Sequence, residues 1–491
     1  MRPDSPGIKK ENIICFIAGL LVVCYVLIRA IHADITYDEA WTLNSFVPLN
    51  VIHVINYTPC DANNHILNTL LIKFFYCIGI ENVFGARLPN VLACILYLVY
   101  AFRISAFLSR TSVVVLFLLL ALNPFVLDFY SLARGYGLGL AFQTMSVYYL
   151  FIFVKNKELK PANYALICSA LAVVSNFSQL NYWAACQLTL LVVFFFFQKG
   201  SGNKSRFITS QLLINVCLAL FIYEPVRKLI KGRNLYYGGD TGFYHDTLVS
   251  LTKYTQYLTE PNGYTYLITN TFLCLAGLGI CFLLLRNVVA KGASLAVENA
   301  LFLLVCTAVA SSVLQHWLLG TLYLIDRTAL FYIPLLMMLL CFTFDLSPPL
   351  IKRAVFVMAV FMSAFNFMIH ANTYKTAIWY FDSHTATILD LLNKKGTAGH
   401  KQVKLDFSWP FQSGVHYYDI QKAYPNVIVL HDAIHNREAI HPSAEYYIYL
   451  GGSLEKVGYN AATQLISSYK KDTIMVFEKE KIYVFENIQP R

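Results

Sequence analysis

Charged residues are scarce in this sequence, at 13% of 491 positions, whereas soluble domains carry about 25%. Hydrophobic residues make up 57%, which excludes a soluble globular enzyme. No cysteine follows Cys341, and no Cys-rich metal motif is present. GxxxxGK(S/T) and GxSxG elements are also missing, which argues against a nucleotide-driven pump and an α/β-hydrolase. No HExxH spacing is present either. No nucleic-acid motif occurs, so we expect no nucleic-acid partner.

Long apolar runs are what the sequence does have, and they recur through its first 372 residues. A bilayer core requires about 20 mostly apolar residues per helix. The sequence therefore predicts a polytopic α-helical membrane protein with about 11 transmembrane helices. The predicted spans are residues 12–31, 88–107, 112–127, 136–154, 164–180, 182–198, 208–223, 266–286, 298–319, 328–345 and 352–370.

Lysine and arginine mark one side of these spans. Lys9 and Lys10 precede the first span, and Lys352 and Arg353 precede the last. Because short cytoplasmic loops are rich in Lys and Arg, this pattern predicts a cytoplasmic N-terminus. The opposite face then receives two large outer loops and everything after the last span. These outer loops are residues 32–87 and 224–264.

The end of the chain has a different character. Residues 373–491 hold 13 Lys and Arg and 12 Asp and Glu, which is typical of a nearly neutral soluble domain. We predict two domains, a transmembrane domain over 1–372 and a small extracytoplasmic α/β domain over 373–491. Its predicted helices are Ala386–Lys395 and Ala461–Lys470, and its predicted strands are Val403–Phe407, Val427–Leu430, Tyr446–Leu450, Thr473–Phe477 and Lys481–Phe485.

Two adjacent carboxylates, Asp38 and Glu39, follow the first span at the outer water boundary. Placed in a cleft, one of them can act as a general base toward a hydroxyl or an amine. The alternative is an ordinary pair of solvated loop acids, since most charged loop residues are simply wet. Their position alone does not choose between the two.

Arg134 breaks the positive-inside pattern, because it lies at the outer turn between the third and fourth spans. Two explanations stand side by side. Arg134 binds an anion, or it forms a structural pair with Asp128, six residues earlier on the same turn.

A second set of outer basic residues follows the seventh span, with Arg227, Lys228 and Lys231 close together. Such groups suit phosphates, and a lipid phosphate is the anion most abundant at a membrane surface. Plain contact with anionic headgroups is the alternative. Asp326 and Arg327 lie at the outer start of the tenth span, where a salt bridge at a helix end is an equally good explanation. His65 can also reach such a cleft, although a lone His is more often structural.

Three short motifs carry a resemblance to a known superfamily. They are Tyr37-Asp38-Glu39-Ala40-Trp41 after the first span, Asn63-Asn64-His65-Ile66-Leu67-Asn68 in the first outer loop, and Ala133-Arg134-Gly135-Tyr136 at the second outer turn. Together they resemble the GT-C membrane glycosyltransferases of the protein O-mannosyltransferase and lipid A aminoarabinose transferase superfamily. The resemblance covers about the first 345 residues.

This resemblance implies a GT-C fold in a bacterial inner membrane and a polyprenyl-phosphate-linked sugar as donor. The acceptor would be an extracytoplasmic lipid, glycan or protein. Asp38 matches the first-loop acid of the family, the candidate base, and Glu39 is its neighbour. Arg134, with Tyr136 beside it, matches the second outer turn and would help hold the donor phosphate. Many relatives have an acid where this chain has Leu132, so that role would shift to Asp128 or vanish.

The resemblance implies no required cofactor, and it leaves a divalent metal open because relatives differ in this respect. It does not identify the sugar, the acceptor or the oligomeric state. A multi-helix transporter or flippase for a lipid-linked or anionic substrate is the alternative function. Transporters place functional charges near the bilayer midplane, whereas the charges here concentrate at one outer rim.

Overall fold

A computed structural model describes residues 9–197, 204–289, 296–430, 441, 443–451 and 471–487. The chain divides into two compact units. The first consists of Met1–Ile31 with Asn50–Ala371, and the second consists of His32–Leu49 with Asn372–Arg491. Residues 32–49 of the first predicted outer loop thus belong to the same compact unit as the C-terminal residues. The two-domain division at residue 372 stays a prediction.

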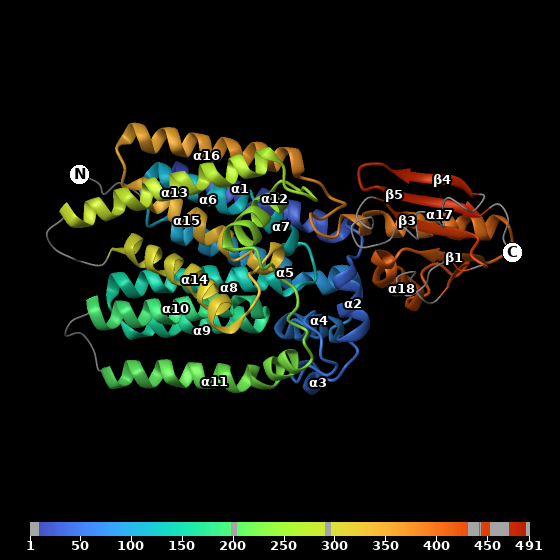
Figure 1. Ribbon diagram of the computed structural model, residues 1–491, viewed down its shortest axis with the longest axis horizontal. Coiled ribbons are helices and arrows are strands. Elements are labelled where there is room, and N and C mark those ends of the chain that lie inside the picture. The colour runs from blue at the N-terminus through green and yellow to red at the C-terminus, as the bar shows by residue number, and fades with distance from the viewer. Residues whose placement is uncertain are drawn as a thin grey trace, which may run out of the picture. The chain divides into compact units, whose positions relative to one another are not determined.

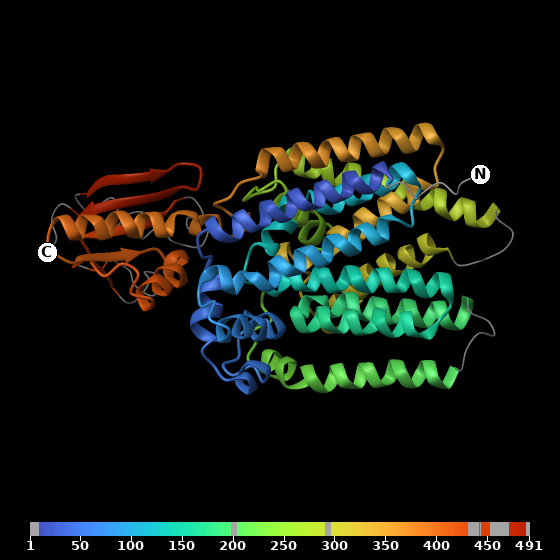
Figure 2. The ribbon, with the colours of Figure 1, turned by 180° about the vertical axis from the view of Figure 1, so that it is seen from behind.

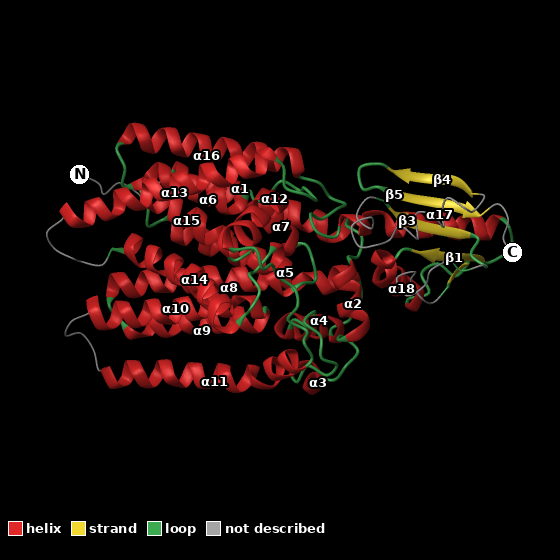
Figure 3. Cartoon of the chain, viewed as in Figure 1, coloured by secondary structure: helices red, strands yellow, loops and turns green. Residues whose placement is uncertain are grey.

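The first unit is built from helices (Figures 1 and 3). Its α-helices are α1 (Lys10–His32), α3 (Val51–Ile55), α4 (Ile66–Cys77), α5 (Val83–Ser105), α6 (Arg110–Ala121), α7 (Pro124–Tyr130), α8 (Gly135–Asn156), α9 (Leu159–Ser175), α10 (Leu180–Val192), α11 (Lys204–Lys231), α12 (Ser250–Thr255), α13 (Gly263–Val289), α14 (Val297–Leu319), α15 (Tyr332–Asp345) and α16 (Pro349–His370). Short 3-10 turns cover Phe177–Gln179 (η1) and Asp326–Ala329 (η4), and π-helical turns cover Val193–Phe197 (η2) and Phe243–Val249 (η3).

Each of the eleven predicted spans overlaps one of these helices. In the described part of the chain, eight helical segments are long and apolar enough to cross a membrane. A ninth candidate is the pair α6 and α7, which is bent by 63°, where Asn123 and Pro124 interrupt the helix. The two remaining predicted spans correspond to shorter apolar helices, α9 with 17 residues and α15 with 14. The polytopic helical membrane fold is therefore confirmed.

The surface of this bundle is apolar where a soluble protein would be polar. Leu220 on α11, Leu285 on α13 and Phe361 on α16 are all exposed large hydrophobic residues. Such continuous apolar surface is expected where helices face lipid. Helix α8 packs against both α5 and α9, and α10 packs against α14. Figure 2 shows the same bundle from behind.

The second unit carries a five-stranded sheet in the order β2-β1-β3-β5-β4. Strand β1 is parallel to β2 and β3, whereas β5 is antiparallel to β3 and β4. The elements are α2 (Tyr37–Ser45), η5 (Tyr380–His384), α17 (Thr385–Ala398), β1 (Val403–Phe407), η6 (Trp409–Phe411), α18 (Gln412–Ile420), β2 (Val427–Val429), β3 (Tyr446–Leu450), β4 (Lys471–Phe477) and β5 (Ile482–Asn487).

The predicted α/β pattern of this unit is confirmed in its described part. The helix predicted near Ala386–Lys395 is α17, and each predicted strand corresponds to one of β1 to β5. The helix predicted over Ala461–Lys470 lies outside the described residues. Apolar side chains of α17, including Ile388 and Leu392, pack on the sheet with Phe407 and Ile482. Burying this alternating pattern forms the core of the unit.

Candidate active site

The first predicted acids lie in α2, a nine-residue helix of the second unit. Glu39 is fully buried, and its Oε2 accepts hydrogen bonds from the backbone N–H and the hydroxyl of Thr36, both at 3.0 Å. Thr36 is the N-cap of the helix, so this is the reciprocal pairing of a capping box. The geometry therefore gives Glu39 a structural task at the start of α2.

Asp38 is also buried, with 8% of its surface exposed. Other acids surround it within the second unit. Burial raises the pKa of the Asp382 carboxyl well above its ordinary value, although a hydrogen bond from the Tyr37 N–H acts in the opposite direction. The neighbouring carboxylates raise this pKa further, and they belong to Asp34, Asp38 and Glu39. Asp38 is thus part of a buried acidic group, which is unlike a solvated loop acid.

Arg134 is almost fully buried in the first unit, where it precedes α8. Its guanidinium donates to the backbone carbonyl of Asn63 at 3.1 Å and also to the side-chain oxygen of Asn63. A third bond goes to Nε2 of His65 at 2.9 Å. The second and third family-like motifs are therefore in direct contact, although Arg134 follows His65 by 69 residues.

Two features of the sequence allow Arg134 to lie close to Asn63 and His65. Gly135 follows Arg134, and a Cβ at Gly135 would lie 1.9 Å from the Ser175 carbonyl oxygen and 2.7 Å from His65 Nδ1. Only glycine fits there. The carbonyl of Ala133 accepts from Asn68 at 3.0 Å, and Asn90 donates to Asn68 at 2.8 Å. These buried amides hold the turn that carries Arg134.

The hydrogen bonds of His65 define its protonation state. Nδ1 lies 3.1 Å from the carbonyl oxygen of Ser175 and must donate, because a carbonyl cannot. Nε2 must accept, because a guanidinium only donates. His65 is therefore neutral. Burial lowers the pKa of His65 well below its ordinary value, and the positive charges of Arg134 and Arg327 lower it further.

This lowered pKa predicts a loss of stability in mild acid. Below the ordinary His pKa of about 6.5, the unfolded chain takes up a proton that folded His65 does not. Stability is therefore complete above that pH and falls as the pH drops, by up to about 1.4 kcal/mol per unit. The thermal unfolding temperature measured in detergent should decrease when the pH is lowered from 8 to 5.5. The decrease should be smaller in His65→Gln. An equal fall in both proteins would contradict this role of His65.

Tyr136 lies in the first turn of α8 and is buried. Its ring is 5.0 Å from the ring of His65 and 4.8 Å from that of Phe129, centroid to centroid. These tilted contacts are favourable aromatic packing. Tyr136 thus belongs to the same cluster as Arg134 and His65.

Asp326 and Arg327 form a second cluster with Tyr237 of the second predicted outer loop. The Tyr237 hydroxyl donates to Asp326, and Arg327 donates to that hydroxyl at 2.8 Å. The guanidinium also lies over the Tyr237 ring at 4.3 Å, a cation–π contact. Burial raises the pKa of Asp326, whereas Arg327 lowers it.

The basic set at the end of α11 is arranged differently. Arg227 forms two bonds with Glu224, at 2.6 and 2.7 Å, on its own helix. Lys228 donates to the Asn56 carbonyl at 2.6 Å and to the Thr58 hydroxyl at 2.8 Å. Lys231 is exposed. Lys228 therefore connects α11 to the first predicted outer loop, and the pairing of Arg227 resembles an ordinary surface ion pair.

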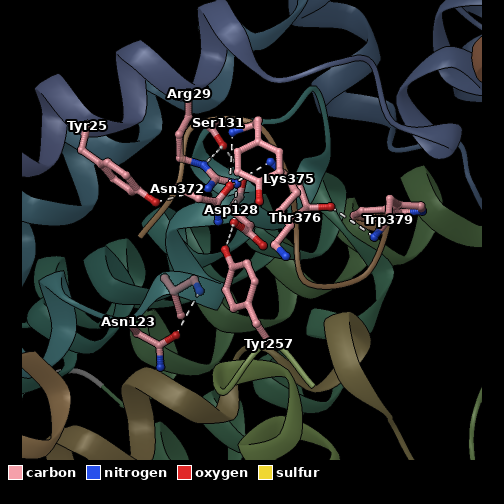
Figure 4. A network of polar contacts seen from close by, with 12 residues as sticks. Tyr25, Arg29, Asn123, Asp128, Ser131, Tyr257, Asn372, Lys375, Thr376 and Trp379 are labelled. Atoms are coloured by element: carbon pink, nitrogen blue, oxygen red, sulfur yellow. Dashed lines mark hydrogen bonds and ion pairs between the residues drawn. The ribbon is translucent and has the colours of Figure 1, made fainter. Parts of the chain in front are cut away.

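Asp128 forms an ion pair with Arg29, whose Nη2 lies 2.6 Å from Oδ1 of Asp128 (Figure 4). Both side chains are buried. Arg29 also donates to the Ser131 hydroxyl at 3.2 Å, and the Tyr257 hydroxyl donates to Asp128. The pairing proposed between Asp128 and Arg134 thus gives way to one with Arg29. We did not predict a role for Arg29, because it lies within the first apolar run; a cation near the outer end of a span was the available signal.

Metal binding was left open by the sequence. Among the residues that the structure describes, no group of three or more His, Cys, Asp and Glu side chains is arranged to hold a metal ion. The acids around Asp38 do not form such a group.

The first unit is thus that of a polytopic helical membrane protein, with Arg134 at the N-cap of α8 and Asp326 and Arg327 in the η4 turn. The architecture of the chain matches that of solved GT-C structures. One is the crystal structure of ArnT from Cupriavidus metallidurans bound to undecaprenyl phosphate, with a TM-score of 0.50 and 9% identity. The other is the apo state of the same protein, with a TM-score of 0.51 and 10% identity. Each match covers 97% of this chain and 98% of the other.

The likeness to ArnT, a lipid A aminoarabinose transferase, shows that this chain has the GT-C fold. The fold expected from the three short motifs is thereby confirmed. No family model matches the sequence, and no curated protein matches it either. At 9–10% identity, the structural match extends to the C-terminal domain, which carries none of the three motifs.

Proposed function

We propose that this protein transfers a sugar from a polyprenyl-phosphate-linked donor to an extracytoplasmic acceptor at a bacterial inner membrane. The observation that carries the proposal is the fold, which is shared over 97% of the chain with a protein solved with undecaprenyl phosphate bound. The Arg134 cluster supports it further, because a buried guanidinium beside a neutral His65 retains its full positive charge for a phosphate.

In the proposed reaction, the acceptor hydroxyl or amine attacks the anomeric carbon of the sugar. Asp38 positions this nucleophile and takes its proton. The bond between the anomeric carbon and the phosphate oxygen breaks, and the lipid phosphate leaves. Arg134 and Arg327 offset the negative charge that grows on the departing phosphate. The donor is already activated by its phosphate ester, so the reaction needs no nucleotide at the site.

The remaining predicted residues take lesser parts in this proposal. Glu39 shapes the start of α2, and Asp326 orients Arg327 through Tyr237. His65 holds Arg134. Lys228 fixes the loop that leads toward Asn63, and Arg227 and Lys231 stand nearer the surface. Asp128 supports the bundle through Arg29.

The proposal is tested on lipids extracted from cells with and without the protein. A polyprenyl-phosphate-linked sugar should accumulate in the cells that lack it, and its mass would identify the sugar. Purified protein in detergent should then convert that lipid to polyprenyl phosphate in the presence of acceptor. Detergent removes the two compartments, so a flippase would leave no chemical product. Unchanged lipid pools, or no product in detergent, would favour the transporter.

A further inference from the structure

Two helices of the second unit are capped at their N-termini by acids from a distant part of the chain. Asp382 Oδ2 accepts a hydrogen bond from the N–H of Tyr37, the first residue of α2, at 2.6 Å. In return, Asp34 Oδ2 accepts from the N–H of Ala386, in the first turn of α17, at 3.1 Å. The partners are 345 and 352 residues apart. We call this pair of bonds the cap clamp.

The clamp satisfies groups that the helices cannot satisfy alone. The first N–H groups of a helix have no partner within it, and carboxylates are favoured there by the helix dipole. His384 stands at the N-cap of α17 but makes no side-chain cap bond. Asp34 supplies the side-chain oxygen that accepts from the first turn of α17, which His384 does not provide. In α2, the Thr36–Glu39 box satisfies part of the first turn, and Asp382 takes the Tyr37 N–H.

The clamp lies in a buried part of the second unit. Asp382 is 1% exposed. A Cβ added at Gly414 of α18 would lie 3.6 Å from Asp382 Oδ1 and 3.9 Å from the Ile35 carbonyl oxygen. The rings of Tyr37 and Trp409 meet edge to face at 6.1 Å. Helices α2 and α18 pack together, and Gly414 of α18 lies beside Asp382 of the clamp.

We propose that the cap clamp makes the C-terminal domain a positioning element for Asp38, with Asp382 as the positioning residue. Asp38 directly follows the residue whose N–H Asp382 holds, so the clamp fixes the backbone from which the Asp38 side chain projects. This inference rests on the proposed function in one respect, since it takes Asp38 as the acceptor's base. The clamp gives the domain a part in the reaction through the backbone that carries Asp38, independent of any acceptor that the domain selects.

The first experiment measures the clamp without any need for activity. Rates of amide hydrogen exchange are compared between the wild-type protein and the two variants Asp382→Ala and Asp34→Ala. Exchange within residues 36–41 should rise by about tenfold or more in Asp382→Ala, and the start of α17 should respond likewise in Asp34→Ala. The matched control is Asp406→Ala. Asp406 is a buried acid of the same domain that accepts from the His441 N–H at 2.8 Å.

Asp406→Ala should leave exchange within residues 36–41 unchanged. Unchanged exchange there in Asp382→Ala, or an equal rise in both variants, would overturn the clamp. Asp382→Asn keeps an oxygen that can accept from the Tyr37 N–H, so it should show slow exchange like the wild type. This variant tests the clamp even if Asp382→Ala folds poorly.

The second experiment measures transfer. Asp382→Ala should lower kcat by roughly ten- to hundredfold with the donor KM nearly unchanged, because misplacing a catalytic group costs turnover. Asp382→Asn should recover most of kcat, and Asp406→Ala should match the wild type. A wild-type kcat in Asp382→Ala with faster exchange at residues 36–41 would overturn the positioning role. If the wild type itself transfers nothing, the proposed function fails, and the exchange data still decide the clamp.

Discussion

Replacing Asp38 by asparagine is expected to lower sugar transfer by about two to four powers of ten, the range for loss of a general base. Asparagine has nearly the same shape as aspartate, so the buried position of Asp38 should be preserved. Its amide cannot accept a proton from the acceptor. The measurement is the initial rate of polyprenyl phosphate release by purified protein, at matched protein concentration and a matched unfolding midpoint.

The neighbouring residue provides the control for this change. Glu39→Gln keeps an amide oxygen able to accept from the Thr36 N–H, and a capping box tolerates glutamine as well as glutamate. Its rate should stay within about tenfold of the wild type. The two variants lie one residue apart in the same helix, so their difference isolates the chemistry of Asp38. Equal turnover by Asp38→Asn and the wild type would remove Asp38 from the mechanism.

The fold could be predicted from the sequence because its signals are local. Apolar runs of about 20 residues indicate helices that span a membrane, because only helices pair all their backbone groups within one segment. The strands β1 to β5 show short apolar stretches between turns. Where the local signal weakens, the prediction also weakens. The span predicted over 112–127 contains Asn123 and Pro124, and the structure breaks it there into α6 and α7.

The site was only partly predictable, since its contacts are long-range. The motifs singled out Arg134, His65 and Tyr136, and the structure brings them together. Nothing in the sequence indicates that Asp382, 345 residues from Tyr37, holds the start of α2. Arg29 was hidden for a different reason, because one cation hardly changes the mean hydropathy of an apolar run.

The three basic residues at the C-terminal end of α11 show that charges close together in sequence can have different partners. Arg227, Lys228 and Lys231 share a short stretch of sequence, which suggested a common phosphate site. In the folded chain, Glu224 neutralises Arg227, and Lys228 holds backbone and hydroxyl oxygens of the first outer loop. Three adjacent charges can therefore have separate tasks, which only their partners reveal.

Arg134→Gln is expected to lower kcat/KM for the donor by about two to three powers of ten, the typical loss when a buried donor to a developing anion is removed. The loss should appear when the lipid-linked sugar is varied, and the KM for acceptor should change little. Arg134→Lys keeps the charge but lacks the planar fork that contacts both Asn63 and His65, so it should recover only part of the rate.

Removing Arg134 also removes hydrogen bonds from Asn63 and His65, so a structural effect must be separated from a loss of donor binding. Direct binding of undecaprenyl phosphate separates them, because a variant that keeps its unfolding midpoint but binds this lipid weakly has lost the phosphate site itself. Arg227→Gln is the matched control, and its half-exposed pairing with Glu224 predicts a change of about threefold or less. A loss equal to that of Arg134→Gln would extend the phosphate site to α11, whereas unchanged donor kinetics in Arg134→Gln would leave Arg134 with a purely structural role.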